Sequence, residues 1–172
     1  FVVMEGILNN SSLFTATTVT SPAKGEDMSS FKPDFSKYDL ICLDYNGDSW
    51  SDETKSKFVE FVKKGGGLVV FHASDNSFSD WEEYNQMIGV GGWGGRTEKH
   101  GPILYWEDGK IKKDKSEGRG GAHGQQDPFV VHTRMPDHPI MKGLPDKWLH
   151  TKDELYYNLR GPAKNMQVLA TA

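Results

Sequence analysis

The 172-residue chain carries 24 acidic and 20 basic residues, for a net charge of −4, and apolar residues make up 36% of it. This balance excludes a disordered chain, and it lacks the basic excess that a nucleic-acid-binding surface needs. No apolar run approaches the ~20 residues that span a bilayer. The single cysteine, Cys42, excludes an internal disulfide and a multi-cysteine metal site. We therefore expect a globular protein with neither a nucleic-acid nor a membrane partner.

The start of the chain predicts a helix followed by two strands. Residues 1–8 have helix-like apolar spacing, and Leu13 to Val19 is rich in β-branched residues, which favour strands. A polar connector over residues 21–37 leads to a buried strand from Tyr38 to Tyr45. Because a helix that feeds a strand implies an earlier strand, we expect one domain over residues 1–172 whose first strand and C-terminal end lie outside this sequence. A homo-oligomer is left open, and no localisation is indicated.

The next segments alternate between helix and strand. Ser51 offers an N-cap hydroxyl to a helix that Gly65 to Gly67 should end. Leu68 to Phe71 is a short apolar run without polar alternation, which is typical of a parallel strand covered on both faces. Ser79 to Glu82 has the spacing of a capping box and predicts a helix through about Ile88.

The middle of the chain interrupts this alternation. Gly89 to Gly95 holds five glycines around Trp93, and Glu107 to Lys110 contains the Asp-Gly signal of a hairpin. Short strands are predicted at Phe129 to His132 and at Val168 to Ala172. The pattern predicts a three-layer α/β/α sandwich with a mostly parallel sheet and an inserted glycine-rich hairpin region. We expect the parallel sheet to contain residues 13–19, 38–44, 68–71 and 168–172.

Polar residues cluster where two of the predicted strands end. His72 follows the strand that ends at Phe71, and Tyr45 and Asn46 follow the preceding strand. Ligands bind at the carboxyl edge of open α/β sheets, so His72 is a candidate general base, hydrogen-bond donor or metal ligand. Asp75 either orients His72 or caps the next segment, and the sequence does not choose between these roles.

Further candidates lie in the glycine-rich middle and near the C-terminus. His100 and His123 both precede glycine, which lets a ligand approach the backbone closely. Together with His72 they form an alternative three-histidine metal site, although their spacing matches no metal motif. Glu154 belongs either to an N-terminal helix cap or a solvated face, or it acts as an acid–base group or binds sugar hydroxyls. We predict that these residues converge, with aromatic walls from Tyr45, Trp81 and Trp93.

Several common catalytic motifs are absent from the sequence. No Gly-x-x-x-x-Gly-Lys-Ser/Thr loop, no dinucleotide-binding Gly-x-Gly-x-x-Gly and no Gly-x-Ser-x-Gly elbow is present. Cys42 lies between Ile41 and Leu43 in an apolar strand, whereas a reactive thiolate needs an electropositive, accessible setting. We therefore interpret Cys42 as a structural residue, and we expect no bound cofactor.

Six short stretches, in order, resemble the trehalose-utilisation, or ThuA-like, family. They are residues 38–40, Gly65 to Ala73, Trp81 to Asn85 with Ile88-Gly89, His138 to Ile140 with Gly143 to Pro145, Asp153 to Tyr156, and Val168 to Ala172. The resemblance implies a flavodoxin-like fold of the class I glutamine amidotransferase type, in a bacterial protein of carbohydrate metabolism. Those amidotransferases carry a nucleophilic cysteine in the turn after the central strand. Here that turn begins with His72, so the resemblance extends to shape and not to glutaminase chemistry.

The sequence thus predicts a protein that acts on a small-molecule carbohydrate, a sugar or keto-sugar derivative. In the enzyme hypothesis, His72, Asp75 and Glu154 supply acid–base chemistry, while Tyr45, Asn46, Trp81, Trp93, His100 and His123 bind the substrate. The alternatives are a sugar-binding domain without catalysis, and a metal-dependent hydrolase that uses His72, His100 and His123.

Overall fold

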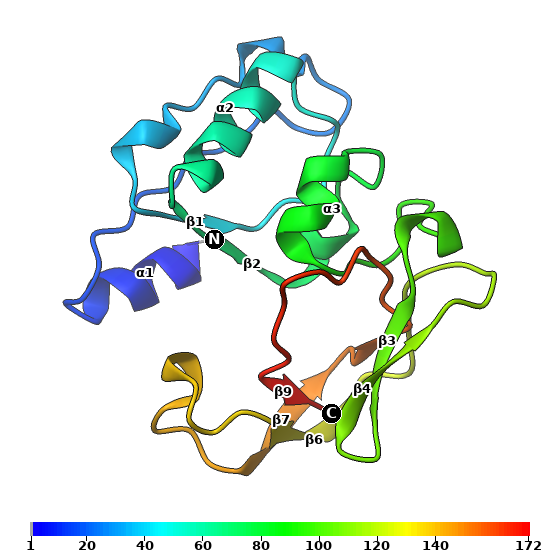
Figure 1. Ribbon diagram of the computed structural model, residues 1–172. Coiled ribbons are helices and arrows are strands. Elements are labelled where there is room, and N and C mark those ends of the chain that lie inside the picture. Colours follow the sequence, from blue (N-terminus) through cyan, green and yellow to red (C-terminus); the bar gives the residue numbers. More distant parts are fainter. Residues whose placement is uncertain (1) are drawn as a thin grey trace. The chain divides into compact units, whose positions relative to one another are not determined.

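The structure, a computed structural model, describes residues 2–172 and shows a mixed α/β protein with helices and small sheets (Figure 1). The chain divides into two compact units, Phe1–Ser77 and Phe78–Ala172, called here the first and the second unit. Among residues 2–172, no helix is long and apolar enough to cross a membrane. Each unit has its own aromatic core and its own sheets.

The centre of the first unit is a strand–helix–strand segment. Strand β1 (Leu40–Leu43) and strand β2 (Gly67–Val70) pair in parallel, and helix α2 (Asp52–Lys63) connects them. The helix begins where predicted, since Ser51 Oγ accepts the N–H of Thr54 at 3.3 Å. It ends before Gly65, whose φ of 95° is readily adopted only by glycine. The predicted parallel pairing of these two strands is therefore confirmed.

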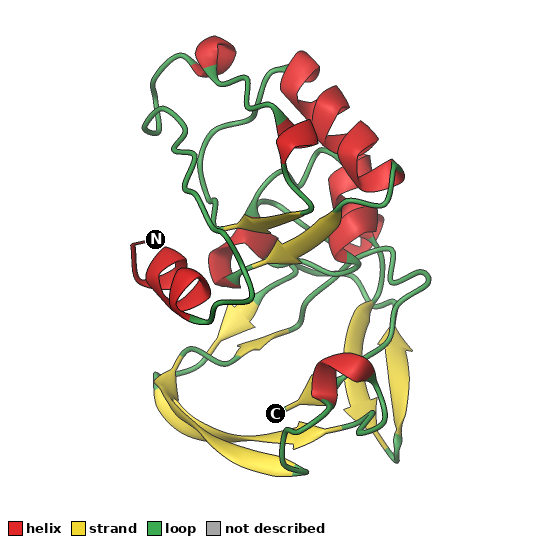
Figure 2. Cartoon of the chain, turned by 90° about the vertical axis from the view of Figure 1, so that its left-hand side faces the viewer, coloured by secondary structure: helices red, strands yellow, loops and turns green. Residues whose placement is uncertain are grey.

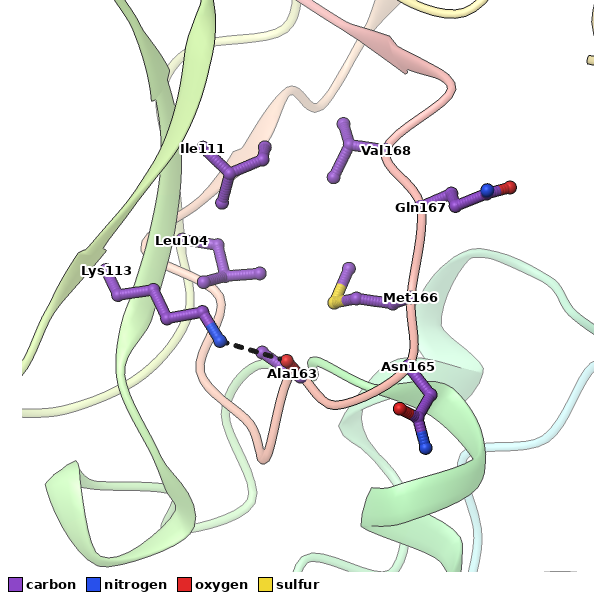
Figure 3. Close-up of a pocket in the computed structure, with 8 residues that line it drawn as sticks. All are labelled: Leu104, Ile111, Lys113, Ala163, Asn165, Met166, Gln167 and Val168. Carbon is purple, nitrogen blue, oxygen red and sulfur yellow. Dashed lines mark hydrogen bonds between the residues drawn. The ribbon is translucent and has the colours of Figure 1, made fainter.

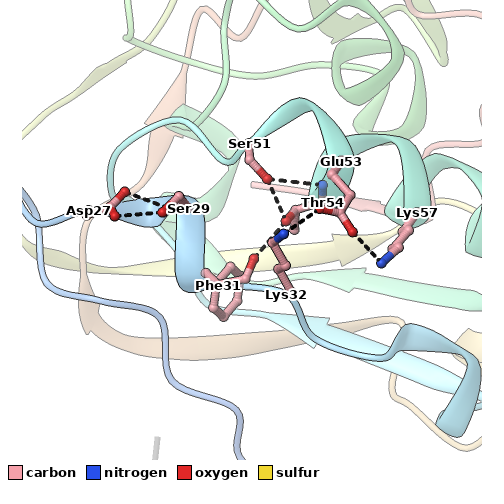
Figure 4. Close-up of polar contacts among 8 residues, drawn as sticks. All are labelled: Asp27, Ser29, Phe31, Lys32, Ser51, Glu53, Thr54 and Lys57. Carbon is pink, nitrogen blue, oxygen red and sulfur yellow. Dashed lines mark hydrogen bonds and ion pairs between the residues drawn. The ribbon is translucent and has the colours of Figure 1, made fainter.

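Aromatic side chains build the core of the first unit beside α2. Phe58 is fully buried, and its ring meets those of Phe35 and Trp50 edge-on at centroid distances of 5.3 and 5.4 Å. Polar contacts fix the start of the same helix (Figure 4): Thr54 Oγ1 donates to Phe31 O at 2.7 Å, and Lys32 pairs with Glu53 at 2.7 Å. The apolar face of α2 thus packs against the connector that precedes β1.

The predicted helix at the start of the chain is present as α1 (Val2–Asn10), but the predicted strand from Leu13 to Val19 is absent. Side-chain hydrogen bonds explain the difference. Asn9 Nδ2 donates to Ala16 O at 3.1 Å, and Asn9 Oδ1 accepts from Ala16 N at 2.7 Å. The amide group of Asn9 therefore takes the backbone bonds that a neighbouring strand would supply.

Within residues 2–172, cover on both faces of the Leu68 to Phe71 strand is not seen. Val69 is 45% exposed and Phe71 is 46% exposed. Among the described residues of the first unit, β2 pairs only with β1, and α2 lies on one side of this strand pair (Figure 2). A run of apolar residues indicates which residues favour burial, whereas cover on the second face depends on what packs there.

The second unit begins with helix α3 (Glu82–Ile88) and the hairpin of β3 (Ile103–Glu107) and β4 (Lys110–Asp114). The hairpin is confirmed with the predicted turn: Asp108 and Gly109 have φ values of 53° and 77°, as the favoured two-residue turn requires. The predicted helix through Ile88 is confirmed as well.

The capping box expected at the start of α3 does not form. Trp81 is the N-cap residue and makes no side-chain cap bond. Ser79 Oγ donates instead to Gly94 O, and Asn85 Nδ2 donates to Ser79 O at 2.7 Å. A serine hydroxyl bonds to the nearest available backbone group, and here the glycine-rich loop is nearer than the first turn of the helix.

The remaining strands of the second unit are antiparallel. A short pair joins β5 (Ala122–His123) to β8 (Tyr156–Tyr157), and β6 (Asp127–Thr133) lies between β7 (Lys147–Asp153) and β9 (Ala170–Thr171). The strand predicted at Phe129 to His132 is therefore confirmed within β6. Short 3-10 helices complete the chain: η1 (Met28–Ser30), η2 (Phe35–Lys37), η3 (His72–Asn76), η4 (Glu98–His100) and η5 (Pro139–Met141).

The strand at Val168 to Ala172 was expected in the parallel sheet, and this expectation is wrong. Its central residues form β9, which pairs antiparallel with β6 through His132 and Thr133. Arg134 holds the segment, since its backbone N–H donates to Leu169 O at 2.8 Å and its Nε donates to Thr171 Oγ1 at 2.8 Å. Specific bonds from a partner strand, which the residues of 168–172 do not encode, decide the direction of pairing.

Candidate functional site

The turn after β2 in the first unit has an unusual backbone. His72 adopts a φ of 45°, in the left-handed region that non-glycine residues rarely occupy. Its side chain is exposed, and two residues later Ser74 is fully buried. Ser74 Oγ donates to Leu43 O at 2.8 Å and accepts the N–H of Tyr45 at 2.6 Å. The turn is thereby fastened to the end of β1.

Of the other candidate site residues in the first unit, one packs against an aromatic ring and the others are exposed or half-buried. The Tyr45 ring meets Trp50 edge-on at 5.4 Å, and its hydroxyl donates to Asp48 O. Burial raises the pKa of Tyr45, so this phenol stays protonated and packs rather than ionises. Asn46 is exposed, and Asp75 is half-buried within η3.

In the second unit, the pairing of β5 with β8 gathers aromatic and polar side chains. His123 and Tyr156 are direct partners in this pair. The Trp93 ring lies 4.5 Å from that of Tyr156 and 5.9 Å from that of His123, between ring centroids. Together with Glu154 and Gln126, these residues are called here the His123 cluster.

The polar groups of the His123 cluster are accessible and close to one another. His123 Nε2 lies 4.0 Å from Glu154 Oε1, and the two side chains are 41% and 26% exposed. Gln126 Nε2 donates to the same Glu154 oxygen at 3.4 Å. His123 Nδ1 lies 2.9 Å from the carbonyl oxygen of Gly124. Because a carbonyl only accepts, Nδ1 carries a proton in this bond, and Nε2 faces the carboxylate.

The side chain of Asp153 holds the backbone of Glu154 in place. Asp153 Oδ1 accepts the backbone N–H of Glu154 at 2.8 Å, while Asp153 Oδ2 lies 3.3 Å from His150 Nε2. The His150 ring in turn packs on Phe129, with centroids 4.8 Å apart. This chain of contacts links the carboxylate of the cluster to the β6–β7 pair.

The loop that presents Trp93 is tightly constrained. Trp93 has a φ of 42°, and its N–H donates to Gly120 O at 2.9 Å. A Cβ added to Gly121 would lie 2.5 Å from Trp93 N, so only glycine fits against this loop. An aromatic residue in a left-handed conformation is costly, which indicates that the surrounding glycines are placed to hold it.

Two further predicted residues of the second unit take structural roles. Trp81 is only 7% exposed, and it packs between Phe78 and Tyr84 at centroid distances of 5.4 and 5.6 Å. His100 Nδ1 accepts the backbone N–H of Thr97 at 3.0 Å, which caps η4. In the described part of the chain, no three His, Cys, Asp or Glu side chains gather as metal ligands would.

Sequence reasoning missed Tyr156 and Gln126. A usable signal was present for Tyr156, because it stands in the stretch Asp153 to Tyr156 that resembles the ThuA-like family and holds the predicted Glu154. Gln126 carried no such signal, because only the approach of residues 126 and 154 across the fold brings its amide to the carboxylate.

A separate groove of about 560 Å³ lies between the β3–β4 hairpin and the segment that leads to β9 (Figure 3). Its walls are mostly apolar, and Lys113 Nζ donates to Ala163 O at 3.1 Å across it. None of the residues predicted from the sequence to form the site lines this groove. The His123 cluster is thus the place in the second unit where predicted site residues converge.

Two comparisons with known proteins point to the same family. A family model described as ThuA, trehalose utilisation, matches residues 3–172. The chain is similar to a solved structure from Parabacteroides merdae, described as a ThuA-like protein, with 52% sequence identity and a TM-score of 0.96. The match covers 99% of this chain and 61% of that one, so this chain spans about three fifths of the length of that relative. A comparison with curated proteins found no significant match.

Proposed function

This chain belongs to the ThuA (trehalose utilisation) family, and from that premise we propose that it acts in carbohydrate metabolism by binding a sugar or keto-sugar derivative at the His123 cluster. The observation that carries the proposal is the meeting of two aromatic rings, an imidazole and a carboxylate at the short β5–β8 pair. The family gives the area of metabolism, and the cluster gives the place and the chemistry.

The chemistry of the cluster suits a polyol. The C–H bonds of a sugar ring carry slight positive charge and pack against the negative faces of aromatic rings such as Trp93 and Tyr156. When the His123 ring is neutral, its Nε2 and Glu154 Oε1 are both acceptors, and they lie 4.0 Å apart, too far for a direct hydrogen bond. A sugar hydroxyl placed between them would donate to one of them and relieve the repulsion of two facing acceptors.

The same two groups can move a proton. A neutral imidazole with Nε2 unprotonated serves as a general base, and the neighbouring carboxylate stabilises the imidazolium that forms. Isomerisation, elimination and hydrolysis of a sugar derivative all use such a step. The proposed chemistry uses protein side chains alone and needs no bound cofactor. His72 and Asp75 of the first unit remain a second proposed acid–base pair.

A second candidate function is sugar binding without conversion. It is favoured by the hydrogen bonds that already engage the cluster, from Gln126 to Glu154 and between His123 and Gly124. Groups engaged in this way resemble the convergent polar groups that fix the orientation of a ligand in a binding site. Binding and conversion therefore have to be measured separately.

The test is a panel of disaccharides and their oxidised keto forms, offered to the full-length protein. Binding is followed by calorimetry and conversion by mass spectrometry. We expect Glu154→Gln to lower turnover ~10²–10⁴-fold, the usual share of general acid–base catalysis. The matched control is Glu107→Gln, an exposed carboxylate on the β3–β4 hairpin, which should match wild type.

Each result of the panel decides between the hypotheses. Conversion that Glu154→Gln abolishes supports the enzyme, and binding without conversion by wild type supports the binding domain. Equal conversion by wild type and Glu154→Gln would show that the carboxylate takes no part in the reaction. Absence of binding to every member would contradict the proposed ligand class.

We also propose that β1 and β2 belong to a larger parallel sheet in a flavodoxin-like sandwich of the full-length protein. The support is the parallel β1–α2–β2 segment together with exposed apolar residues on its strands, Leu40 at 40% and Val69 at 45%. Parallel strands in general carry cover on both faces. A crystal structure of the full-length protein in which Val69 stays exposed and β2 gains no further strand would contradict this.

Glutaminase activity should be absent despite the proposed similarity of fold. His72 occupies the turn after β2, and Cys42 lies within β1. Burial, with a smaller effect from the charge of Asp44, raises the pKa of the Cys42 thiol, so the nucleophilic thiolate is disfavoured. We expect no release of ammonia from glutamine above the buffer rate. Release that disappears in Cys42→Ala would prove this wrong.

A further inference from the structure

One buried arginine contacts both loops that lead to the His123 cluster. Arg160 is 1% exposed, and its guanidinium donates to two carbonyl oxygens on different segments. Nη1 reaches Gly101 O at 3.1 Å, and Nη2 reaches Ser116 O at 2.6 Å. The planar fork of arginine suits this bridging, because its donors point in fixed, different directions.

The backbone of Arg160 makes a second link. Its N–H donates to Gly91 O at 2.9 Å, and its carbonyl accepts the N–H of Gly91 at 2.7 Å. Gly91 lies two residues before Trp93 in the glycine-rich loop. Main chain and side chain of one residue thus hold the Trp93 loop at both of its ends, near Gly91 and near Gly101.

The loop that leads to His123 is fitted against the same side chain. A Cβ added to Gly120 would lie 3.2 Å from both Cβ and Cγ of Arg160. Gly120 O accepts the N–H of Trp93 at 2.9 Å, and Gly121 N donates to Asn158 O at 2.9 Å. The stem of Arg160 therefore sets the position of the loop whose carbonyl holds Trp93.

Acidic residues balance the buried charge. The pKa of Glu98 is held below its ordinary value, first by hydrogen bonding to the backbone of Gly118 and also by the charge of Arg160. The pKa of Asp114 is lowered first by the backbone N–H of Ser116 and further by Arg160. A buried guanidinium has a large desolvation cost, which the two carbonyls and these carboxylates reduce, although the buried Arg160 Nε has no hydrogen-bond partner among the described residues.

We infer that Arg160 is a positioning residue that holds Trp93 and His123 in the arrangement that binds the sugar. The inference rests on the proposed function of the His123 cluster. The side-chain hydrogen bonds of Arg160 go to Gly101 O and Ser116 O, and not to Trp93 or His123. Arg160 therefore acts on the two rings through the backbone, at Gly91, Gly101, Ser116 and Gly120. Its role is to fix two loops, and the loops present the rings.

The test compares Arg160→Lys with Arg134→Lys in the full-length protein. The matched control arginine lies over Trp106 and bonds to Thr171, outside the cluster. We expect Arg160→Lys to speed hydrogen exchange at the N–H groups of Trp93 and Gly121 relative to the control. For the substrate found by the panel, KM should rise about 10- to 100-fold, as expected when binding groups are displaced by about 1 Å, with a smaller change in kcat.

Hydrogen exchange tests the positioning role of Arg160, and ligand binding tests the proposed function, so the two proposals can fail separately. Unchanged exchange at Trp93 and Gly121 in Arg160→Lys overturns the positioning role, whatever the ligand. If wild type binds no member of the panel, the proposed function is wrong, and exchange alone still decides whether Arg160 holds the loops.

A second variant keeps the test decisive if Arg160→Lys does not fold. Gly120→Ala leaves Arg160 present and places a methyl group against its stem. It should speed the same exchange and weaken the same binding, with Gly6→Ala of the first unit as a control, because a Cβ there meets nothing within 4 Å. Wild-type exchange and affinity in Gly120→Ala would contradict the inference.

Discussion

Each unit of the molecule presents an exposed histidine, and the two differ in what surrounds them. His72 of the first unit stands at the end of a parallel strand, beside buried serines that bond to backbone groups. His123 of the second unit stands beside a carboxylate and two aromatic rings. The first region follows a general rule about where sites lie in α/β sheets, and the second assembles groups that can bind and react.

The difference teaches that position and chemistry are separate evidence. A strand end brings a side chain to an edge, but polar groups there are often used to close the turn, as Ser74 is. In the His123 cluster, a partly exposed carboxylate and an imidazole face each other at 4.0 Å without a direct hydrogen bond. Polar groups that face each other without a direct hydrogen bond are available to bind a ligand.

The largest expected effect comes from removing the two histidines in turn. We expect His123→Ala to lower turnover of the sugar derivative ~10²–10⁴-fold, because it deletes the proposed general base. His72→Ala should retain most of the turnover, and His132→Gln, an exposed histidine on β6, serves as the control. Initial rates at saturating substrate measure all three. A larger loss in His72→Ala would move the reaction to the strand end of the first unit.

The core of the first unit should carry stability and not ligand binding. Phe58→Ala removes a fully buried ring from the cluster with Phe35 and Trp50, which should cost about 3–5 kcal/mol in the free energy of unfolding. Phe14→Ala, at a position that is 49% exposed, should change it by less than about 0.5 kcal/mol. Denaturant titration measures both. Equal stability of the two variants would mean that the aromatic core does not hold this unit.

The serine that fastens the His72 turn should have a smaller effect. Ser74→Ala removes the buried hydroxyl that bonds to Leu43 O and Tyr45 N, whereas Leu43 O keeps the N–H of Phe71 at 2.9 Å. We expect a loss of about 1–3 kcal/mol in the free energy of unfolding. Ser36→Ala, an exposed hydroxyl bonded to Asp34, is the control. If Ser74→Ala matches Ser36→Ala, the turn is held by other contacts.

The smallest expected effect is a pH dependence at the start of α2. Hydrogen bonds and charges of Lys32 and Lys57 lower the pKa of Glu53 from 4.5 to about 2. Because the folded pKa is depressed, this contribution to stability is present above pH 4.5 and is lost as the pH falls toward 2. Thermal unfolding of Glu53→Gln should therefore depend slightly less on pH in this window than wild type does. An identical pH dependence would show that the bridges contribute nothing, as many exposed pairs do.

Local chemistry made several elements predictable from the sequence. Ser51 and Gly65 bound helix α2, and Asp108-Gly109 forms the hairpin turn, because capping bonds and positive φ values depend on a few neighbouring residues. The alternation of β1, α2 and β2 followed from apolar patterning. His123, Trp93 and Glu154 were proposed for the site from their residue types and their settings.

Only the tertiary structure decided which of these residues meet. Residues 93, 123 with 126, and 154 with 156 come from three separate stretches of the chain, and the β5–β8 pair and the loops around Arg160 bring them together. The same holds for the failures: Asn9 replaces a strand partner for Ala16, and Arg134 draws residues 168–172 into an antiparallel pair. Long-range contacts depend on partners that no local pattern indicates. The local sequence therefore identified the candidate residues, and the tertiary structure determined which of them form the site.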